Sequence, residues 1–439
     1  MRQKGCRKFS TCSSPFFLIK MQENEKNCEK TGKIMNFYQF CLTRMPFWII
    51  IYLVYWIFWR SFSEGDFNQS ENGIFGKGRL RSREATVINM AYLVLNNGMV
   101  FEGTRFGAAV DQIGELVFHT GMVGYLETLT DPAFAGQILV GTFPLSGNYG
   151  VIEEDFDGIP ALHGFVVRSL CDTPSNFRSQ YPLETFLCDH GIPAICDVDT
   201  RELVRVLREE GTMNAMISDE IQASMDAIHQ YEVKHVVEKV SAKETKVYPS
   251  VGETKYRVTL IDYGSQKSFI SAFCAHGCEV TVVPHTAKAE NILADRPDAV
   301  VLSGGPGDPT ELTDEIAELK KIIGVVPVFG VGLGHQLAAL ALGGKIEKLP
   351  YGHRGGNQPV REIGGTRTYI TSQNHGYAVL AESLSHVGIE RFANANDGTN
   401  EGMEYPAEKC FTLQFTPDTL GGAHSTAFLY DRFFEMLAR

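Results

Sequence analysis

The sequence predicts an α/β protein with two folded domains: a mixed α/β domain over residues 90–240, and a second domain over 257–439 with a mainly parallel sheet and flanking helices. In the second domain, runs rich in Val and Ile alternate with helical stretches, which is typical of a parallel sheet covered on both faces. Period-two alternation and a hairpin turn mark the start of the first domain. Residues 241–256 are polar and aperiodic, and their Pro249 and Gly252 favour a linker.

Charge is divided unevenly along the chain. The formal net charge of the 439 residues is −12, but residues 1–89 carry 14 Lys/Arg and 7 Asp/Glu, whereas residues 90–439 carry 26 and 45. An acidic body opposes nucleic-acid binding, because contact with the phosphate backbone requires a basic surface. We expect a soluble partner subunit or a small substrate, and no nucleic acid.

The ten cysteines do not form the pattern of a disulfide framework or a metal site. Four lie in the first tenth of the chain, and the other six show no CxxC or repeating spacing. This usage is typical of reduced thiols in a cytosolic protein. We therefore expect a cytoplasmic protein without a metal site.

Residues 1–89 are a different kind of sequence, with a basic, polar start and a dense apolar run of 13 residues over 47–59. A bilayer-spanning helix needs about 20 apolar residues, and the run lies too far from the start, without a cleavage site, for a signal peptide. Three interpretations stay open: a natural start at Met90 that leaves the extension outside the mature protein, which we favour; a short membrane anchor; or a partner-binding segment. A native mass near that of residues 90–439 would exclude the anchor.

The elements of the first domain follow from local patterns. Residues 92–103, YLVLNNGMVFEG, predict a hairpin closed by Asn96, Asn97 and Gly98, since Asn-Gly tolerates the positive φ of a tight turn. The run QILVGTF predicts a strand. Residues 200–211, TRELVRVLREEG, have apolar residues at helical spacing and a glycine stop, which predict a helix.

The second domain combines predicted strands RVTLID, EVTVV, AVVLSGG and VPVFGV with predicted helices SFISAFCAHG and HQLAALALGG. The last strand runs directly into the last helix, with Gly332 at the turn inside a GxxxG frame from Gly330 to Gly334. This is the pattern of a nucleophile elbow, which exposes its central side chain and aims backbone N–H groups at a developing oxyanion. Gly332 has no side chain to attack with, so an ordinary glycine turn is the alternative.

Longer motifs surround the elbow: TGMVGYLETLTDP, PLSGNYG and DVDTRELVRVLREEG in the first domain, and LIDYG with Lys267, LSGGPGDP, GVGLGHQLAALALGG, KLPYGHRGGNQPV and TSQNHGY in the second. In this order and spacing they resemble the carbamoyl phosphate synthase small chain, from about Tyr92 to the C-terminus and without the extension. The resemblance implies a C-terminal class I glutamine amidotransferase domain, whose ammonia travels to an ATP-using large chain.

In that family an elbow cysteine attacks the glutamine carboxamide, and a His-Glu pair from a later HPE segment activates it. The resemblance assigns these three positions to Gly332, Thr416 and Asp418. Threonine cannot accept and return a proton near pH 7, and a nucleophile acting within a unit contributes on the order of a million-fold in rate. We therefore expect no intact catalytic residue and no glutamine hydrolysis.

Replacements for the triad are not evident in the sequence. His424 matches a histidine that the family has anyway. Cys274 and Cys278 are predicted on the first helix of the second domain, away from the strand ends where sites form. Three changes at one site favour relaxed selection on glutamine hydrolysis rather than an accident.

The resemblance also implies a glutamine pocket. Its expected lining is Gly305, Gly307, Leu333, Gln336, Asn374, Gly376 and Tyr377. Gly305 would also lend an oxyanion N–H, although turn geometry alone is the alternative explanation for the glycines. A serine usual in the family is Ala133 here, which removes a hydroxyl contact. His353 and Arg354 are expected to be structural.

Nucleotide binding is not expected in this chain. The GGPGDP loop lacks the lysine and hydroxyl of a GxxxxGK[ST] loop. The chain is expected to hold no cofactor, with ATP and Mg on the large chain.

The predicted function is that of a carbamoyl phosphate synthase small subunit, paired with a large chain, fed by free ammonia, and serving arginine or pyrimidine biosynthesis. The alternative is a non-catalytic binding or regulatory protein that retains the amidotransferase fold and binds glutamine without hydrolysing it. A third possibility is an intact enzyme with an unrecognised nucleophile. Failure to co-purify with a large chain would favour the second.

Overall fold

The computed structural model describes residues 90–221, 224–417 and 426–438. The extension with its apolar run, Asp418 and His424 lie outside the described residues, and the described ones belong to a compact unit over Ala85–Arg439. Across these ranges, no helix is both long and apolar enough to cross a bilayer.

The first domain is built on a closed barrel of seven strands in the order β1-β2-β8-β6-β4-β3-β9. The strands are β1 Met90–Leu95, β2 Val100–Gly107, β3 Gln112–His119, β4 Gln137–Gly141, β6 Gly164–Val166, β8 Pro193–Cys196 and β9 Met213–Ser218. A two-stranded sheet pairs β5 Leu145–Ser146 with β7 Ser169–Leu170. Closure leaves no unpaired strand edge in the barrel.

Local sequence explains two elements of the first domain, a hairpin and a helix. The predicted hairpin is present as β1 and β2, and Gly98 in its turn has φ of 86°. The predicted helix over residues 200–211 is α6 Thr200–Glu210, in which the Asp199 carboxylate accepts a hydrogen bond from Glu202 N and Gly211 ends the helix at φ of 89°. An N-cap acid and a C-terminal glycine satisfy helix-end groups at little steric cost.

The second domain contains one ten-stranded sheet in the order β10-β12-β11-β13-β14-β19-β18-β17-β15-β16. Its strands are β10 Lys246–Tyr248, β11 Tyr256–Asp262, β12 Cys278–Pro284, β13 Ala299–Leu302, β14 Val328–Val331, β15 Lys345–Glu362, β16 Thr368–Leu380, β17 Ile389–Asn394, β18 Asn400–Tyr405 and β19 Cys410–Leu413. The α/β class is confirmed.

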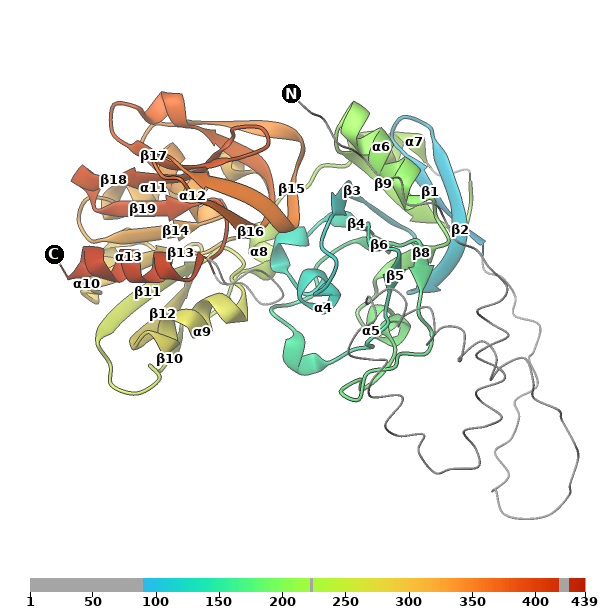
Figure 1. The fold of residues 1–439 in the computed structure, drawn as a ribbon, viewed down its shortest axis with the longest axis horizontal. Coiled ribbons are helices and arrows are strands. Elements are labelled where there is room, and N and C mark those ends of the chain that lie inside the picture. The colour runs from blue at the N-terminus through green and yellow to red at the C-terminus, as the bar shows by residue number, and fades with distance from the viewer. Residues whose placement is uncertain (1–89, 222–223, 418–425, 439) are drawn as a thin grey trace, which may run out of the picture. The chain divides into compact units, whose positions relative to one another are not determined.

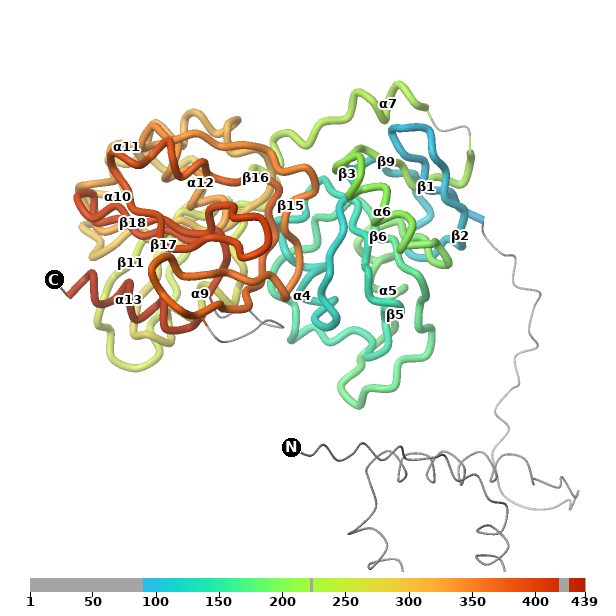
Figure 2. Tube along the Cα trace, turned by 45° about the horizontal axis from the view of Figure 1, so that its top comes forward, coloured from blue at the N-terminus to red at the C-terminus, as the bar shows by residue number. Residues whose placement is uncertain are grey.

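Parallel pairing covers one half of this sheet, from β12 through β11, β13 and β14 to β19. The other half is antiparallel, and β15 and β16 form a long ribbon that Figure 2 shows in orange. The predicted linker over 241–256 includes the edge strand β10, which pairs antiparallel with β12. The sheet is therefore mixed, and its parallel half leads to the elbow.

Helices cover both faces of the ten-stranded sheet (Figure 1). The helices of this domain are α9 Lys267–Ala275, α10 Ala289–Ala294, α11 Thr313–Ile322, α12 Leu333–Ala341 and α13 Phe428–Leu437. One buried core joins α10, α11 and α12 to the sheet, and a second, rich in aromatic rings, joins α9 and α13 to the opposite face. Strands buried on both faces explain the near-continuous apolar runs in the sequence.

The remaining helices lie in the first domain and before β10. They are α4 Tyr125–Leu129, α5 Leu183–Asp189, α7 Met225–Gln230 and α8 Val236–Val240. Short 3-10 turns are η1 Pro132–Phe134, η2 Glu153–Asp155, η3 Pro309–Glu311, η4 Ala381–Leu384 and η5 Pro406–Glu408. Of these, η1 contributes to the candidate site.

Candidate active site at the β14–α12 turn

The turn between β14 and α12 has the geometry of a nucleophile elbow. Gly332 lies between strand and helix with φ of 53° and ψ of −115°. Its N–H donates to Leu413 O (2.9 Å), and Gly334 N donates to Ser303 O (3.0 Å). A Cβ on Gly334 would lie 2.5 Å from Leu302 Cβ, so a larger residue would push the helix away from β13. The GxxxG frame thus allows close packing of helix and strand.

Space for a side chain is present at Gly332. A Cβ built there would meet Gly304 Cα at 3.3 Å and Gln414 O at 3.9 Å, and nothing closer. The positive φ would strain any L residue. A side chain at residue 332 therefore has enough space. The backbone conformation there is one that glycine adopts without strain.

Gly332 opens onto a cavity of about 290 Å³. The cavity is lined by His119, Thr120, Gly121, Met122, Val123, Gly124, Glu127, Thr128, Asp131, Ala133, Phe134, Asp157, Gly264, Gln266, Phe269, Gly304, Gly305, Val331, Gly332, Leu333, Gly355, Gly356, Asn357, Ser372, Gln373, Asn374, Gln414, Phe415 and Thr416. Both domains contribute. Of the described residues, no cysteine is in this lining.

Two of the three triad positions face this cavity. Gly332 follows β14, and Thr416 follows β19, the parallel neighbour of β14. The carboxyl ends of neighbouring parallel strands meet at one edge of a sheet, which is where α/β sites form. The third position, Asp418, lies outside the described residues.

The predicted glutamine-binding residues separate into two groups. Gly305, Leu333 and Asn374 line the cavity, as does Ala133. The others do not: Gly307, Gln336, Gly376 and Tyr377.

Gln336 and Tyr377 make hydrogen bonds to other residues of the protein near the cavity. The Gln336 amide donates to Tyr377 O (2.9 Å) and to Gln414 Oε1 (3.1 Å), and the Tyr377 hydroxyl donates to Asp308 Oδ2 (3.1 Å). Burial and then the charge of Asp308 raise the pKa of Tyr377. Gln336 therefore ties α12 to β16 and to the segment that carries Thr416.

The first domain adds acidic groups that the sequence reasoning did not single out. Asp131 accepts hydrogen bonds from Ala133 N (2.9 Å) and from Asn374 Nδ2 (3.0 Å), and the second bond links η1 to β16. Burial raises the pKa of Asp131 to about 6 and also raises the pKa of Glu127 and Asp157. These carboxylates are the formally charged side chains in the described lining.

His119 is a further cavity residue that was missed. Its Nδ1 accepts a hydrogen bond from Gly121 N (3.2 Å), and burial followed by the charge of Arg354 lowers its pKa to about 4. The imidazole is therefore neutral at pH 7. Its place directly before the TGMVGY motif was the available signal.

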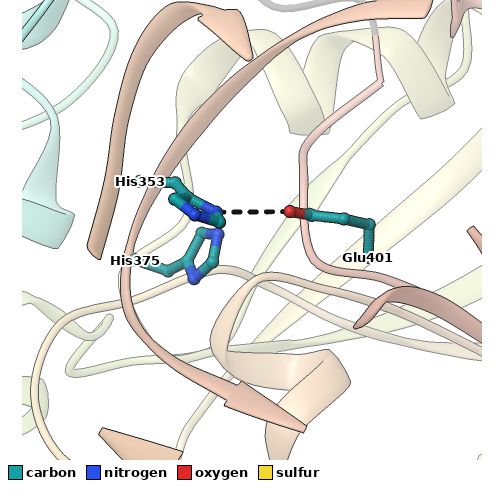
Figure 3. A group of neighbouring side chains, drawn as sticks. All are labelled: His353, His375 and Glu401. Carbon is teal, nitrogen blue, oxygen red and sulfur yellow. Dashed lines mark ion pairs between the residues drawn. The ribbon is translucent and has the colours of Figure 1, made fainter. Parts of the chain in front are cut away.

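A buried polar cluster joins His353 on β15, His375 on β16 and Glu401 on β18 (Figure 3). Gln373 on β16 is buried with them. His353 Nδ1 lies 3.3 Å from Glu401 Oε1, and His353 Nε2 lies 2.8 Å from Asp397 Oδ2. Gln373 also lines the cavity. That His353 is structural stays a prediction.

The pKa values of the two histidines in this cluster shift in opposite directions. Burial opposes a charged imidazole at His353, but the hydrogen bond and charge of Glu401 raise its pKa above the ordinary value. Burial and the neighbouring His353 hold the pKa of His375 well below the ordinary value. Burial raises the pKa of Glu401. His375 is therefore neutral near pH 7.

Comparisons with known proteins agree with this fold. Residues 259–436 match the family model for class-I glutamine amidotransferases, and residues 93–217 match that for the CPSase domain of the carbamoyl-phosphate synthase small chain. The second domain is thus a class I glutamine amidotransferase domain.

Full-length relatives extend this assignment. The chain is 41% identical to the carbamoyl phosphate synthase small chain of Oceanobacillus iheyensis over 351 residues (79% of this chain, 95% of that protein), and 43% identical to that of Clostridium perfringens over 351 residues (78% and 98%). It is 41% identical to the pyrimidine-specific small chain of Bacillus subtilis over 350 residues (79% and 95%). The chain belongs to the carbamoyl phosphate synthase small-chain family.

Proposed function

We propose that this chain pairs with an ATP-using large chain to make carbamoyl phosphate, does not hydrolyse glutamine, and is supplied with free ammonia. The observation that carries the proposal is Gly332 at the elbow. A cavity of about 290 Å³ faces a turn that has no nucleophilic atom, and Thr416 faces the same cavity where the resemblance expects a base. Removing a nucleophile from a catalytic unit costs on the order of a million-fold in rate.

Retention of the pocket supports glutamine binding without hydrolysis. Asp131, Asn374 and Gly305 remain around the cavity, and its charged lining is acidic, which suits the ammonium group of an amino acid. Titration calorimetry with L-glutamine measures this, with D-glutamine as the matched control. We expect binding heat with L-glutamine and none with D-glutamine, and we expect no release of glutamate.

The test of the main proposal is the choice of nitrogen donor. The purified pair of this chain and its large chain should make carbamoyl phosphate from ATP, bicarbonate and ammonium chloride, and none above background from glutamine. The large chain alone with ammonium is the control for what docking adds. Glutamine-dependent synthesis that requires this chain would refute the loss of hydrolysis. Failure to co-purify with a large chain would favour the non-catalytic binding protein.

A further inference from the structure

In the buried polar cluster, hydrogen-bond acceptors face one another. The His375 imidazole must donate from Nδ1, because its partner there is the backbone carbonyl Tyr377 O at 2.9 Å. A neutral imidazole then has a lone pair on Nε2. Gln373 Oε1 lies 3.2 Å from that Nε2, and an amide oxygen is also an acceptor.

The orientation of the Gln373 amide is determined by its other contacts. Gln373 Nε2 donates to Glu401 Oε2 (2.8 Å) and to Thr371 Oγ1 (3.1 Å). Turning the amide over would place its oxygen against the carboxylate instead. The contact between His375 and Gln373 is therefore a pair of acceptors with no hydrogen between them.

A second pair of facing acceptors lies beside the first, and here an amide donor, Asn394 Nδ2, contacts both atoms. His353 Nε2 donates to Asp397 Oδ2, so its Nδ1 also has a lone pair, which faces Glu401 Oε1 at 3.3 Å. Asn394 Nδ2 lies 3.3 Å from this Nδ1, as expected of an acceptor, and 3.1 Å from Glu401 Oε1. A proton on His353 would relieve this pair alone. A second proton on His375 would place two imidazolium rings with centroids 5.0 Å apart in the interior.

We propose that a divalent cation, zinc by ligand type, binds between His353 Nδ1, His375 Nε2, Glu401 Oε1 and Gln373 Oε1. Atoms of His353, His375 and Glu401 all lie within 4.8 Å of one another. Ligands about 2.0–2.2 Å from a tetrahedral zinc are roughly 3.3 Å apart, close to the two measured separations. Such a cation would run against the sequence-based expectation that this chain has no metal site.

The surroundings of the site are those of a metal centre. Each imidazole donates its other N–H to an oxygen, His353 to a carboxylate and His375 to a backbone carbonyl, and such partners fix the tautomer of a metal-bound histidine. Glu401 is fully buried and Asp397 is half-exposed, so a divalent ion between neutral imidazoles balances both carboxylates. The ion would hold β15, β16 and β18 together behind the Gln373 side of the cavity.

The test measures zinc on the untagged full-length chain after loading with zinc and desalting. One zinc per chain is expected by mass spectrometry, with a loss of at least tenfold in His375→Gln and Glu401→Gln. The matched control is His285→Gln, because His285 pairs with Glu315 at 2.8 Å at similar burial but lacks a second histidine. This control should keep its zinc.

Cobalt gives an answer that does not depend on the variants folding. Co²⁺ in the wild-type chain should give the visible bands of a four-coordinate site without thiolate charge-transfer absorption, which separates this site from any cysteine site. Less than a tenth of a zinc per chain, equal zinc in wild type and Glu401→Gln, or a thiolate band would overturn the proposal.

Discussion

The elbow at Gly332 and the buried polar cluster belong to one domain, and they differ in the side chains that they supply. The elbow keeps its backbone geometry but has no reactive side chain. The cluster keeps a full set of titratable side chains, each with hydrogen-bond partners. Gly332 supplies no side chain to the packing around the cavity, whereas a buried charge cannot lose its partner without a large cost.

The largest expected effect tests whether the elbow is otherwise intact. Replacing Gly332, Thr416 and Asp418 by Cys, His and Glu should raise glutamine hydrolysis at least about a thousand-fold over wild type, because the three groups act as a unit. Glutamate release measures the rate. The matched control carries Gly332→Ala with the other two changes. A triple variant no faster than this control would show that the rest of the site has also degenerated.

Glu401→Ala should be the most destabilising single change in the cluster. It removes the partner of His353, Gln373 and Asn394 in a fully buried position. Breaking a buried pair in this way costs about 3–5 kcal/mol. Urea unfolding in the presence of a chelator measures the free energy. Arg205→Ala, which breaks exposed ion pairs on α6, is the comparison and should leave the midpoint nearly unchanged. If Glu401→Ala and Arg205→Ala lowered the free energy of unfolding equally, the predicted importance of the buried charge would be contradicted.

The acidic wall of the cavity predicts a pH dependence. Burial raises the pKa of Asp131 from 3.8 to about 6, so the native state binds the proton more tightly than the unfolded state. The resulting stabilisation is complete below pH 3.8 and is lost as the pH rises through 6. About two pKa units correspond to roughly 3 kcal/mol.

Asp131→Asn measures this effect. The asparagine oxygen can still accept from Ala133 N, but the side chain no longer titrates. Between pH 4 and pH 7 the wild-type free energy of unfolding should fall by about 2.4 kcal/mol relative to the variant. Parallel pH profiles of the two proteins would show that Asp131 titrates normally.

The sequence predicts individual helices, strands and turns better than it predicts which strands pair with one another. The hairpin at Gly98, the helix α6 and the elbow follow from local patterns, because turn glycines and apolar spacing act over a few residues. The antiparallel half of the sheet was not predicted. Its ribbon strands, such as KIEKLPYGHRGGNQPVRE, have no clear alternation, so their pairing depends on distant partners.

The site shows the same limit. Gly332 and Asn374 could be placed at the cavity from the family motifs, but Asp131 and His119 reach it only through the folding of the first domain. The buried polar cluster was overlooked because Gln and Glu are mostly exposed in proteins and His is only intermediate in burial. Only contacts between β15, β16 and β18 reveal that these side chains are buried together.

The smallest predicted effect concerns the cost of a side chain at the elbow. Gly332→Ala should lower the free energy of unfolding by about 1–2 kcal/mol, because an L residue at φ of 53° and ψ of −115° is strained. Gly304→Ala is the control: this glycine borders the same cavity, a Cβ on it would meet no atom within 4 Å, and its φ is not positive. It should be near neutral.

The same cost applies to the restored cysteine, so Gly332→Cys should unfold at lower urea than wild type while the triple variant gains activity. A side chain at this turn works against stability, because glycine adopts this backbone conformation without the strain that an L residue incurs. If Gly332→Ala is as stable as wild type, the elbow has relaxed to a conformation without strain. A restored cysteine would then lack the exposed geometry that attack on glutamine requires.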